Sequence, residues 1–244
     1  MTNKSDNETA EKKVSDVRPN YFVGAIVDNV EIECEHAKVN SRPTVKRTVE
    51  YHSIQAQRVI QRSFTRVKGA FYSISIILNT LTKDDEVVQR IDDYVDQQFM
   101  VVEKEILDAQ ARIKKILDDN GIEESINYSN PKKFTLFIDS PRINNFLKLL
   151  TQLDRLILLM DTAWLANELN DVQLKNGSYQ WQRRVMKFAG SIVNLENRAR
   201  SAASKKGKDA EVNKLAPVDQ SKQHEELEME SQVQDNDLKL EAIG

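Results

Sequence analysis

The sequence contains few of the residues that make turns and loops. It has 7 Gly and 5 Pro among 244 residues, which argues against an all-β or low-complexity chain and favours long helices. Hydrophobic residues make up 40% of the chain and charged residues 30%, enough for one buried core and a well-solvated surface. The length favours a single domain, with or without tails.

Long apolar segments are also missing. No run of about 18 apolar residues occurs, so we expect no transmembrane helix and no membrane partner. Residues 1–17 are polar throughout and lack the apolar middle of a signal peptide. We therefore expect a soluble, cytoplasmic protein.

Cysteine and histidine are scarce. Cys34 is the only cysteine, which excludes an internal disulfide and a Cys-rich zinc site. No HExxH, P-loop, GxGxxG or nucleophile-elbow pattern occurs. Cys34 could form a nucleophile with His36 or His52, but its place in an alternating apolar pattern favours a buried structural thiol. We expect no enzyme, no cofactor, no metal site and no small-molecule substrate.

Charge is sorted into blocks along the chain, although the formal net charge is only −3. Residues 38–68 carry eight basic side chains and one acidic one, and residues 177–208 carry the same numbers. Residues 84–108 carry nine acidic side chains and two basic ones. Basic blocks create a field that a polyanion such as DNA can feel. The alternative is that basic and acidic segments simply pack beside each other.

The composition divides the chain into three parts. Residues 1–18 are predicted to be a disordered arm, because they are polar and offer little to bury. Residues 19–203 are predicted to form a single helical domain for DNA binding and dimerisation. Residues 204–244 are predicted to be a disordered acidic tail, with seven acidic residues and two lysines in 221–244. Such tails mostly solvate a protein, and some compete with DNA for a basic face.

Two segments alternate with the period of a β-strand. In the first, Val30, Ile32 and Cys34 alternate with glutamates, and the apolar run 21–27 could pair with it as a hairpin. The second strand is predicted over residues 132–138. Its alternation places Phe134, Leu136 and Ile138 on one side and Lys133, Thr135 and Phe137 on the other.

The rest of the domain has helical spacing. Residues 51–68 are predicted to be helical, and the isoleucine-rich run 70–81 could be a buried helix or a strand. The clearest helix begins near Thr82 and ends at Asn120–Gly121. Two more are expected over residues 142–169 and 179–203, separated by a break at Gly177–Ser178. The fold class is therefore mostly α with short β-strands (α+β), with long helices around one core.

The second strand and the helix after it resemble the order found in ribbon–helix–helix proteins. In those proteins two chains pair one strand each, and the ribbon enters the major groove with polar side chains at every second position. Lys133 and Thr135 could supply such contacts. Ser140 or Asp139 is expected to cap the next helix, with Pro141 in its first turn, so Ser140 and Arg142 could hold a phosphate. The alternative is an ordinary interior strand, and Phe137 interrupts the polar side.

Basic residues at helical spacing suggest contacts with the phosphate backbone. Arg58, Arg62 and Arg66 recur every four residues, and could instead pair with the acidic block 84–108. The last helix adds a second basic group. Its predicted DNA contacts are Arg183, Arg184 and Lys187.

Four strings in this order resemble the AcaB-like family of conjugative-element proteins. They are VEIECEHA, DDEVVQRIDDYV, SPRINNFLKLLTQLDRLILLMDTAWL and QRRVMKFAGSIVNLENRAR, within about residues 21–200. The resemblance implies a dimeric, DNA-binding activator of conjugative-transfer genes that binds upstream of a promoter. It also implies a ribbon–helix–helix-like unit. Such a unit gives added weight to Lys132, Lys133 and Thr135 as DNA contacts. The four strings do not themselves assign DNA contacts, so the predicted site residues remain inferences from this sequence.

The sequence is therefore compatible with two functions. The first is a sequence-specific transcriptional regulator that binds promoter DNA as a homodimer, with RNA polymerase as a candidate partner. The second is a structural or accessory protein of a conjugation complex without sequence-specific DNA contact. The apolar stretch Leu153–Leu165 favours the second.

Overall fold

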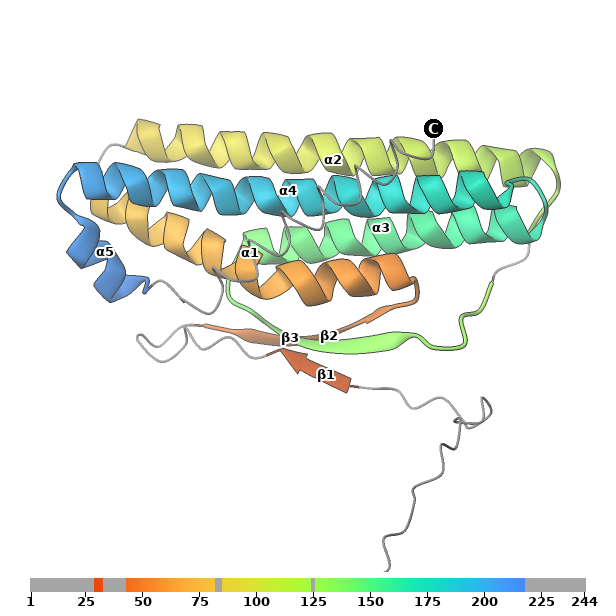
Figure 1. Cartoon of the computed structure of the whole chain (residues 1–244), viewed down its shortest axis with the longest axis horizontal. Coiled ribbons are helices and arrows are strands. Elements are labelled where there is room, and N and C mark those ends of the chain that lie inside the picture. Colours follow the sequence, from red (N-terminus) through yellow and green to blue (C-terminus); the bar gives the residue numbers. More distant parts are fainter. Residues whose placement is uncertain (1–28, 33–42, 82–84, 124–125, 218–244) are drawn as a thin grey trace, which may run out of the picture.

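The structure is a computed structural model, and it describes residues 29–32, 43–81, 85–123 and 126–217. Long helices lie on one side of a small sheet, as Figure 1 shows. The expected α+β class, mostly helical, is confirmed. In chain order the elements are β1 (Asn29–Ile32), β2 (Val45–Tyr51), α1 (Ile54–Leu81), α2 (Asp85–Asp119), β3 (Lys132–Ile138), α3 (Pro141–Leu165), α4 (Asp171–Lys205) and α5 (Asp209–Leu215).

The sheet has the strand order β1-β3-β2. β1 runs parallel to β3, with Asn29 opposite Lys133, and β2 runs antiparallel to it, with Thr48 opposite Thr135. The predicted strand 132–138 is confirmed, and β1 confirms the described part of the first one. The expected hairpin partner, residues 21–27, and Cys34 lie outside the described residues. β2 was not predicted. Residues 45–50 were assigned to no element, and Tyr51 was assigned to a helix.

Helix α1 settles the open question about residues 70–81. The run is helical and continuous with the preceding segment, because its side chains are buried on several sides between neighbouring helices. The predicted start at Tyr51 was wrong, since Tyr51 ends β2 and the hydroxyl of Ser53 accepts the backbone N–H of Ala56 at 3.3 Å. The predicted long helix over α2 is confirmed, and it ends at Asp119, just before Gly121, whose φ is +66°.

Helix α3 begins as predicted, with Ser140 at the N-cap and Pro141 in the first turn. It ends at Leu165 rather than near Leu169, because Asn167 takes a left-handed φ of 62°. The predicted break at Gly177–Ser178 was wrong, since α4 runs through it. A capping box between Asn170 and Gln173 starts that helix earlier.

The helical part extends past the boundary expected at residue 203. α4 continues to Lys205, and α5 packs its Val212 against Ile77 and Ala203. The predicted arm 1–18 and residues 218–244 lie outside the described residues.

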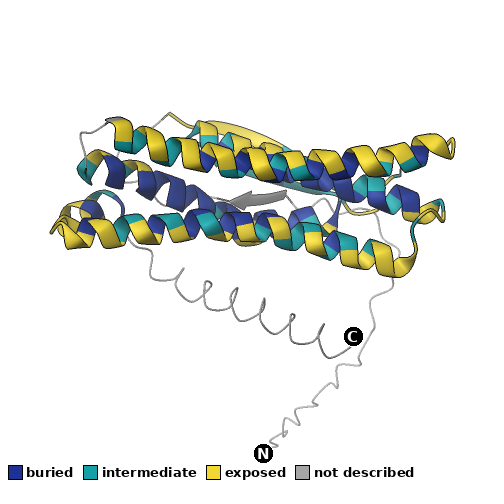
Figure 2. Cartoon of the chain, turned by 90° about the horizontal axis from the view of Figure 1, so that it is seen from above, coloured by how far each residue is buried: buried dark blue, intermediate teal, exposed yellow. Residues whose placement is uncertain are grey.

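One core joins the helices to the inner side of the sheet. Figure 2 shows buried residues along the facing sides of the helices. Phe134 and Leu136 of β3 are fully buried with Phe146 and Leu147 of α3. The predicted apolar side of β3 therefore faces the helices. No helix of the described residues is long and apolar enough to cross a membrane.

Candidate nucleic-acid interface

The side of the sheet that faces away from the helices is polar, and we call it the outer sheet face. Alternation along β2 and β3 places the same parity of residues on it, and the register pairs them across the two strands. In Figure 1 no described helix covers this side. Its members are Lys46, Thr48, Glu50, Lys133, Thr135 and Phe137.

Each cross-strand pair on the outer sheet face makes a contact. Nζ of Lys46 lies 5.7 Å from the centre of the Phe137 ring, so the aromatic residue that interrupts the polar side is partly covered by a cation. The hydroxyls of Thr48 and Thr135 lie 3.5 Å apart.

Lys133 and Glu50 form the third pair. Nζ and Oε2 lie 3.8 Å apart, and the side chains are 44% and 39% exposed. Exposed ion pairs contribute little to stability, so both groups can be recruited by a ligand at low cost.

The position of β3 overturns one detail of the ribbon hypothesis. β2 pairs with all of β3 on one edge, and β1 pairs with residues 133–136 on the other. Two β3 strands from different chains therefore cannot pair as the predicted ribbon, because neither edge is free. In the described part of the chain the antiparallel ribbon is β2 with β3, and β2 is one of the two edge strands of the sheet.

Ser140 and Arg142 act within the fold. The hydroxyl of Ser140 accepts the backbone N–H of Ile143 at 3.3 Å as the cap of α3. The guanidinium of Arg142 pairs with the carboxylate of Asp92 on α2. Lys132 is partly exposed at the start of β3, opposite Tyr51. Of the predicted strand-and-cap contacts, Lys133 and Thr135 are therefore the two on the outer sheet face.

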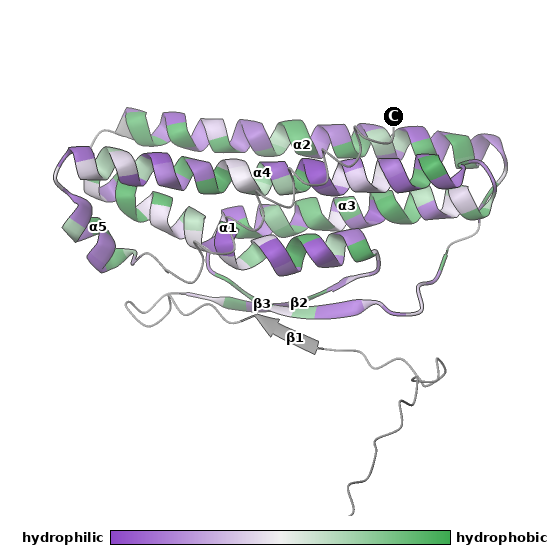
Figure 3. Cartoon of the chain, in the orientation of Figure 1, coloured by the Kyte–Doolittle hydropathy of each residue, from purple (hydrophilic) through white to green (hydrophobic). Residues whose placement is uncertain are grey.

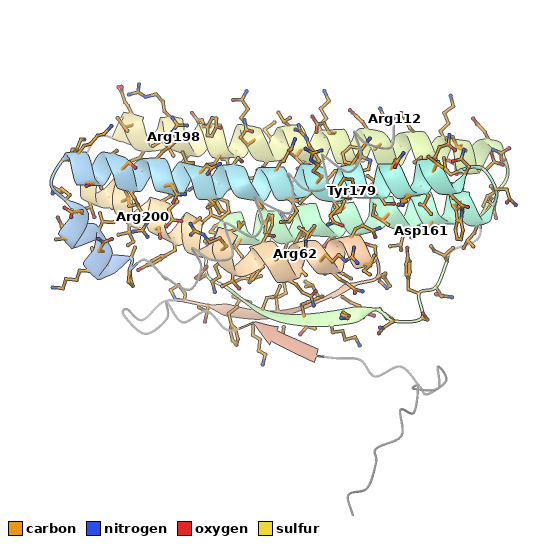
Figure 4. All side chains as sticks on the ribbon, viewed as in Figure 1. Arg62, Arg112, Asp161, Tyr179, Arg198 and Arg200 are labelled. Carbon is orange, nitrogen blue, oxygen red and sulfur yellow. The ribbon has the colours of Figure 1, made fainter. Side chains whose placement is uncertain are left out.

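The arginine stripe on α1 is divided. Nη1 of Arg66 lies 2.6 Å from Oε2 of Glu196 on α4, and both side chains are largely buried. Arg66 therefore forms an ion pair within the fold, with a carboxylate of α4. Arg58 and Arg62 are exposed and make no ion pair with the described residues. Arg62 is labelled on α1 in Figure 4.

The basic residues of α4 are divided in the same way. Arg184 forms a two-pronged pair with Glu105 of α2, at 2.6 and 2.7 Å. Arg183 is partly buried, and Lys187 is exposed with no ion pair to described residues. Of the predicted phosphate contacts on α1 and α4, Arg58, Arg62 and Lys187 are therefore the exposed ones that make no ion pair with a described residue.

Comparison with known proteins places the chain among its relatives. No protein-family model matches the sequence, and no curated protein matches it either. A crystal structure of selenomethionine-containing AcaB from uropathogenic E. coli does match, with 38% sequence identity and a TM-score of 0.71. The match covers 73% of this chain and 92% of the AcaB chain. The chain belongs to the AcaB family. The resemblance drawn from the four sequence strings is thereby confirmed.

In this AcaB-family chain, a buried carboxylate fixes the junction between β2 and α1. Oδ1 of Asp154 accepts the backbone N–H and hydroxyl of Ser53 at 2.8 and 2.6 Å, and Oδ2 lies 3.2 Å from Nδ1 of His52. Burial is the main cause that raises the pKa of nearby Tyr51 above its usual range, and Asp154 adds to it. This network sets where β2 ends, and with it the position of Lys46 and Thr48.

A second carboxylate, that of Asp161, lies farther along α3 and beside the same junction of β2 and α1. Asp161 accepts the hydroxyl of Tyr128. Burial raises the pKa of Asp161 above its usual range, and the charge of Asp154 adds to the rise, although the Tyr128 hydroxyl opposes it. No group of three or more His, Cys, Asp or Glu side chains suited to a metal occurs among the residues that the structure describes.

Sequence reasoning missed Lys46 and Thr48 as site residues. The alternation in VKRTVEY was the available signal, since Lys46, Thr48 and Glu50 occupy every second position. Exposure of the first four β2 side chains hid the strand, because a half-buried strand ordinarily shows a stronger apolar side.

Proposed function

We propose that this protein is a sequence-specific, DNA-binding regulator of the transcription of conjugative-transfer genes. It binds a promoter-upstream duplex as a homodimer and acts as an activator. Membership of the AcaB family supports the proposal, because resemblance to that family implies a DNA-binding activator of conjugative-transfer genes. The outer sheet face is the observation that carries it.

The outer sheet face offers what base recognition in the major groove requires. Cation donors (Lys46, Lys133), hydroxyls that donate or accept (Thr48, Thr135) and a carboxylate acceptor (Glu50) alternate along two antiparallel strands. Base edges in the major groove differ in their donors and acceptors, so such side chains can distinguish them. β-ribbons enter that groove in known DNA-binding proteins.

The outward edge of β2 supports a two-fold ribbon between copies. An edge strand carries unpaired backbone groups that can pair with another chain. If two β2 strands pair antiparallel about Thr48, Lys46 of each copy lies opposite Glu50 of the other. Opposite charges at facing positions favour this register, and like charges would oppose it. The ribbon of the proposal is therefore β2 with β2, which replaces the pairing of β3 strands.

Helices α1 and α4 supply a basic surface for phosphates. α1 has four basic residues and no acidic one, and it lies along α4. Arg58, Arg62 and Lys187 are exposed there. Such contacts add affinity without sequence information, and their strength falls steeply with salt.

The test compares binding of the full chain to promoter-upstream duplexes and to scrambled duplexes across a salt series. We expect dissociation constants that differ by about 10³ or more. Lys133→Ala and Thr48→Ala should each reduce that ratio by about tenfold, since a good base contact contributes roughly 1–3 kcal/mol of discrimination.

Arg62→Ala is the matched control. It should weaken binding to both duplexes alike and reduce the salt slope by about 1, as expected for one phosphate contact. Equal ratios for the wild type and the outer-sheet variants would overturn the assignment of base recognition to this face.

An accessory protein of a conjugation complex is the second candidate function. Exposed apolar residues at the end of the bundle favour it: Trp164 is 38% exposed, Leu165 61% and Val172 66%. Such clusters mark interfaces between proteins. Capture of one stoichiometric protein partner, lost in Leu165→Asp and unaccompanied by DNA, would support this function over the first.

A further inference from the structure

Helix α2 has one side that no described element covers. Its buried side, which includes Val95, Phe99 and Ile106, packs against α3 and α4. Among the helices in Figure 1, α2 lies farthest from the sheet. Its opposite side is exposed, and hydrophilic and hydrophobic residues alternate along α2 in Figure 3.

The exposed side carries a regular seam. Its residues follow one another at intervals of three and four, the spacing that keeps positions facing a partner helix in a coiled coil. All of them are exposed, and the seam is about 42 Å long at 1.5 Å per residue. Its members are Arg90, Asp93, Gln97, Met100, Lys104, Leu107, Ala111, Lys114 and Asp118.

Apolar side chains occupy the middle of the seam. Met100 is 69% exposed and Leu107 42%, and Val101 beside them is 41% exposed. Together they line an open groove with Gln97 and Lys104. A helix of a soluble domain that leaves three large apolar side chains in one groove presents a surface suited to another helix.

When two α2 helices are placed antiparallel, the charged residues at one end of the seam face residues of opposite charge at the other end. In an antiparallel pair of α2 helices, Asp93 lies opposite Lys114 and Arg90 opposite Asp118. Met100 then lies opposite Leu107, and the two Lys104 side chains meet at the two-fold axis, each beside Glu103 of the other copy. Each of these pairs occurs twice, as a self-complementary interface between identical chains requires.

The hydrogen bonds that Asp93 and Arg90 make within α2 leave both side chains able to pair with a second copy. Oδ1 of Asp93 accepts from Nε2 of Gln89 at 2.7 Å, which leaves its second oxygen. Nε of Arg90 donates to the carbonyl of Glu86 at 3.3 Å, which leaves the two terminal nitrogens.

We propose that the exposed side of α2 docks antiparallel on α2 of a second copy. The seam is distinct from the β2 edge, so two copies joined through α2 stand back to back with their outer sheet faces directed away from each other. If those faces bind DNA as proposed, the assembly brings two duplex segments together. The bridging rests on the proposed function, whereas the association of copies does not.

The first test measures the mass of the full chain in solution by light scattering over a concentration series. Leu107→Glu places four carboxylates near the axis, with Glu103, and should weaken the association by tenfold or more. Asp93→Lys and Lys114→Asp should each weaken it, and Asp93→Lys combined with Lys114→Asp should restore it. Arg155→Glu, on the exposed side of α3, is the control and should change nothing. Masses unchanged by Leu107→Glu, or a swap that fails to restore the association, would overturn the proposal.

A second test locates the axis. In a Cys34→Ser background, which has no other cysteine, Lys104→Cys should give a covalent dimer with a short bismaleimide, and Arg155→Cys should not. Cross-linking of Arg155→Cys without cross-linking of Lys104→Cys would place the interface elsewhere. A Lys104→Cys dimer that is lost only when residues of the β2 edge are changed would do so too.

The third test separates this inference from the proposed function. An immobilised duplex carrying the protein should capture a second, labelled duplex. Leu107→Glu should abolish that capture and leave binding to the first duplex unchanged. If the wild type binds no duplex, the proposed function fails, while the mass and cross-linking results still decide whether α2 pairs with α2.

Discussion

Glu196 of α4 and Arg66 of α1 form an ion pair inside the bundle, with 2.6 Å between Oε2 and Nη1. The other oxygen of Glu196 accepts from Nε of Arg200 at 2.9 Å. Arg200 also donates to the hydroxyl of Ser73 on α1 and to the carbonyl of Ala216 after α5. The carboxylate thus joins α4 to α1, and Arg200 extends the network to the residue after α5. These basic residues serve the fold rather than a ligand.

Replacing Glu196 with glutamine should destabilise the protein strongly. The change removes the carboxylate that pairs with both Arg66 and Arg200 inside the bundle, and loss of one partner from a largely buried ion pair costs about 3 kcal/mol or more. Urea denaturation at pH 7 would measure the loss. Glu105→Gln is the control, because the Glu105–Arg184 pair is exposed and contributes about 0–1 kcal/mol. Equal losses in the two variants would contradict the assigned role.

The same carboxylate predicts loss of stability in acid. Burial alone would raise the pKa of Glu196, but Arg66 and Arg200 outweigh it and hold the pKa below its ordinary value of 4.5. A carboxyl group whose pKa is lowered by folding stabilises the protein above its unfolded pKa, and that contribution is lost as the pH falls through the folded value. The free energy of unfolding of the wild type should therefore fall below about pH 4.5. Glu196→Gln should show a smaller fall between pH 5 and 3, and equal falls would contradict the prediction.

Asp161 should behave in the opposite way. Burial raises its pKa above the ordinary value of 3.8, so its ionised form is less favourable in the folded protein than in the unfolded one. Its contribution is fully present below the unfolded pKa and is lost as the pH rises through the folded one. Asp161→Asn should raise the urea midpoint at pH 7 and leave it unchanged near pH 3. A lower midpoint at pH 7 would show that the charge helps the fold, for example through Tyr128.

Two glycines in α4 make a matched pair of stability variants. A Cβ on Gly190 would meet nothing within 4 Å, whereas a Cβ on Gly177 would lie 2.5 Å from Cε of Met160. Alanine in a helix interior is more favourable than glycine by about 0.5–1 kcal/mol. Gly190→Ala should gain about that amount, and Gly177→Ala should gain less because Met160 must move. Thermal denaturation would check the order, and equal gains would mean that Gly177 has no packing role.

Gly177 also shows why part of the fold was not predictable from local patterns. In sequence, Gly177–Ser178 looks like a break. In the structure the glycine lies within a helix where α4 approaches Met160 of α3, and that need for a small residue is visible only in three dimensions. By contrast, the start of α3 was predictable, because Ser140 and Pro141 act within a single turn.

The candidate site shows the same contrast between features set by local sequence and contacts between residues far apart in the chain. Period-two alternation was sufficient to place Lys133 and Thr135 together on the polar side of β3, since parity along a strand is local. The roles of Arg66, Arg142 and Arg184 were not predictable, because their carboxylate partners lie on other helices, 130, 50 and 79 residues away. β2 was missed for a related reason: its partner strand begins only after two long helices.

The central place of β3 also sets an order of events during synthesis. Thr48 precedes its cross-strand neighbour Thr135 by 87 residues, and β1 and β2 both pair with β3. Neither strand has its partner until residue 132 has left the ribosome, by which time α1 and α2 have been made. Pairing across such a separation is slow and leaves strand edges open to other chains. Lys46, Arg47 and Glu50 keep the waiting β2 segment charged, and charged strands resist aggregation with one another.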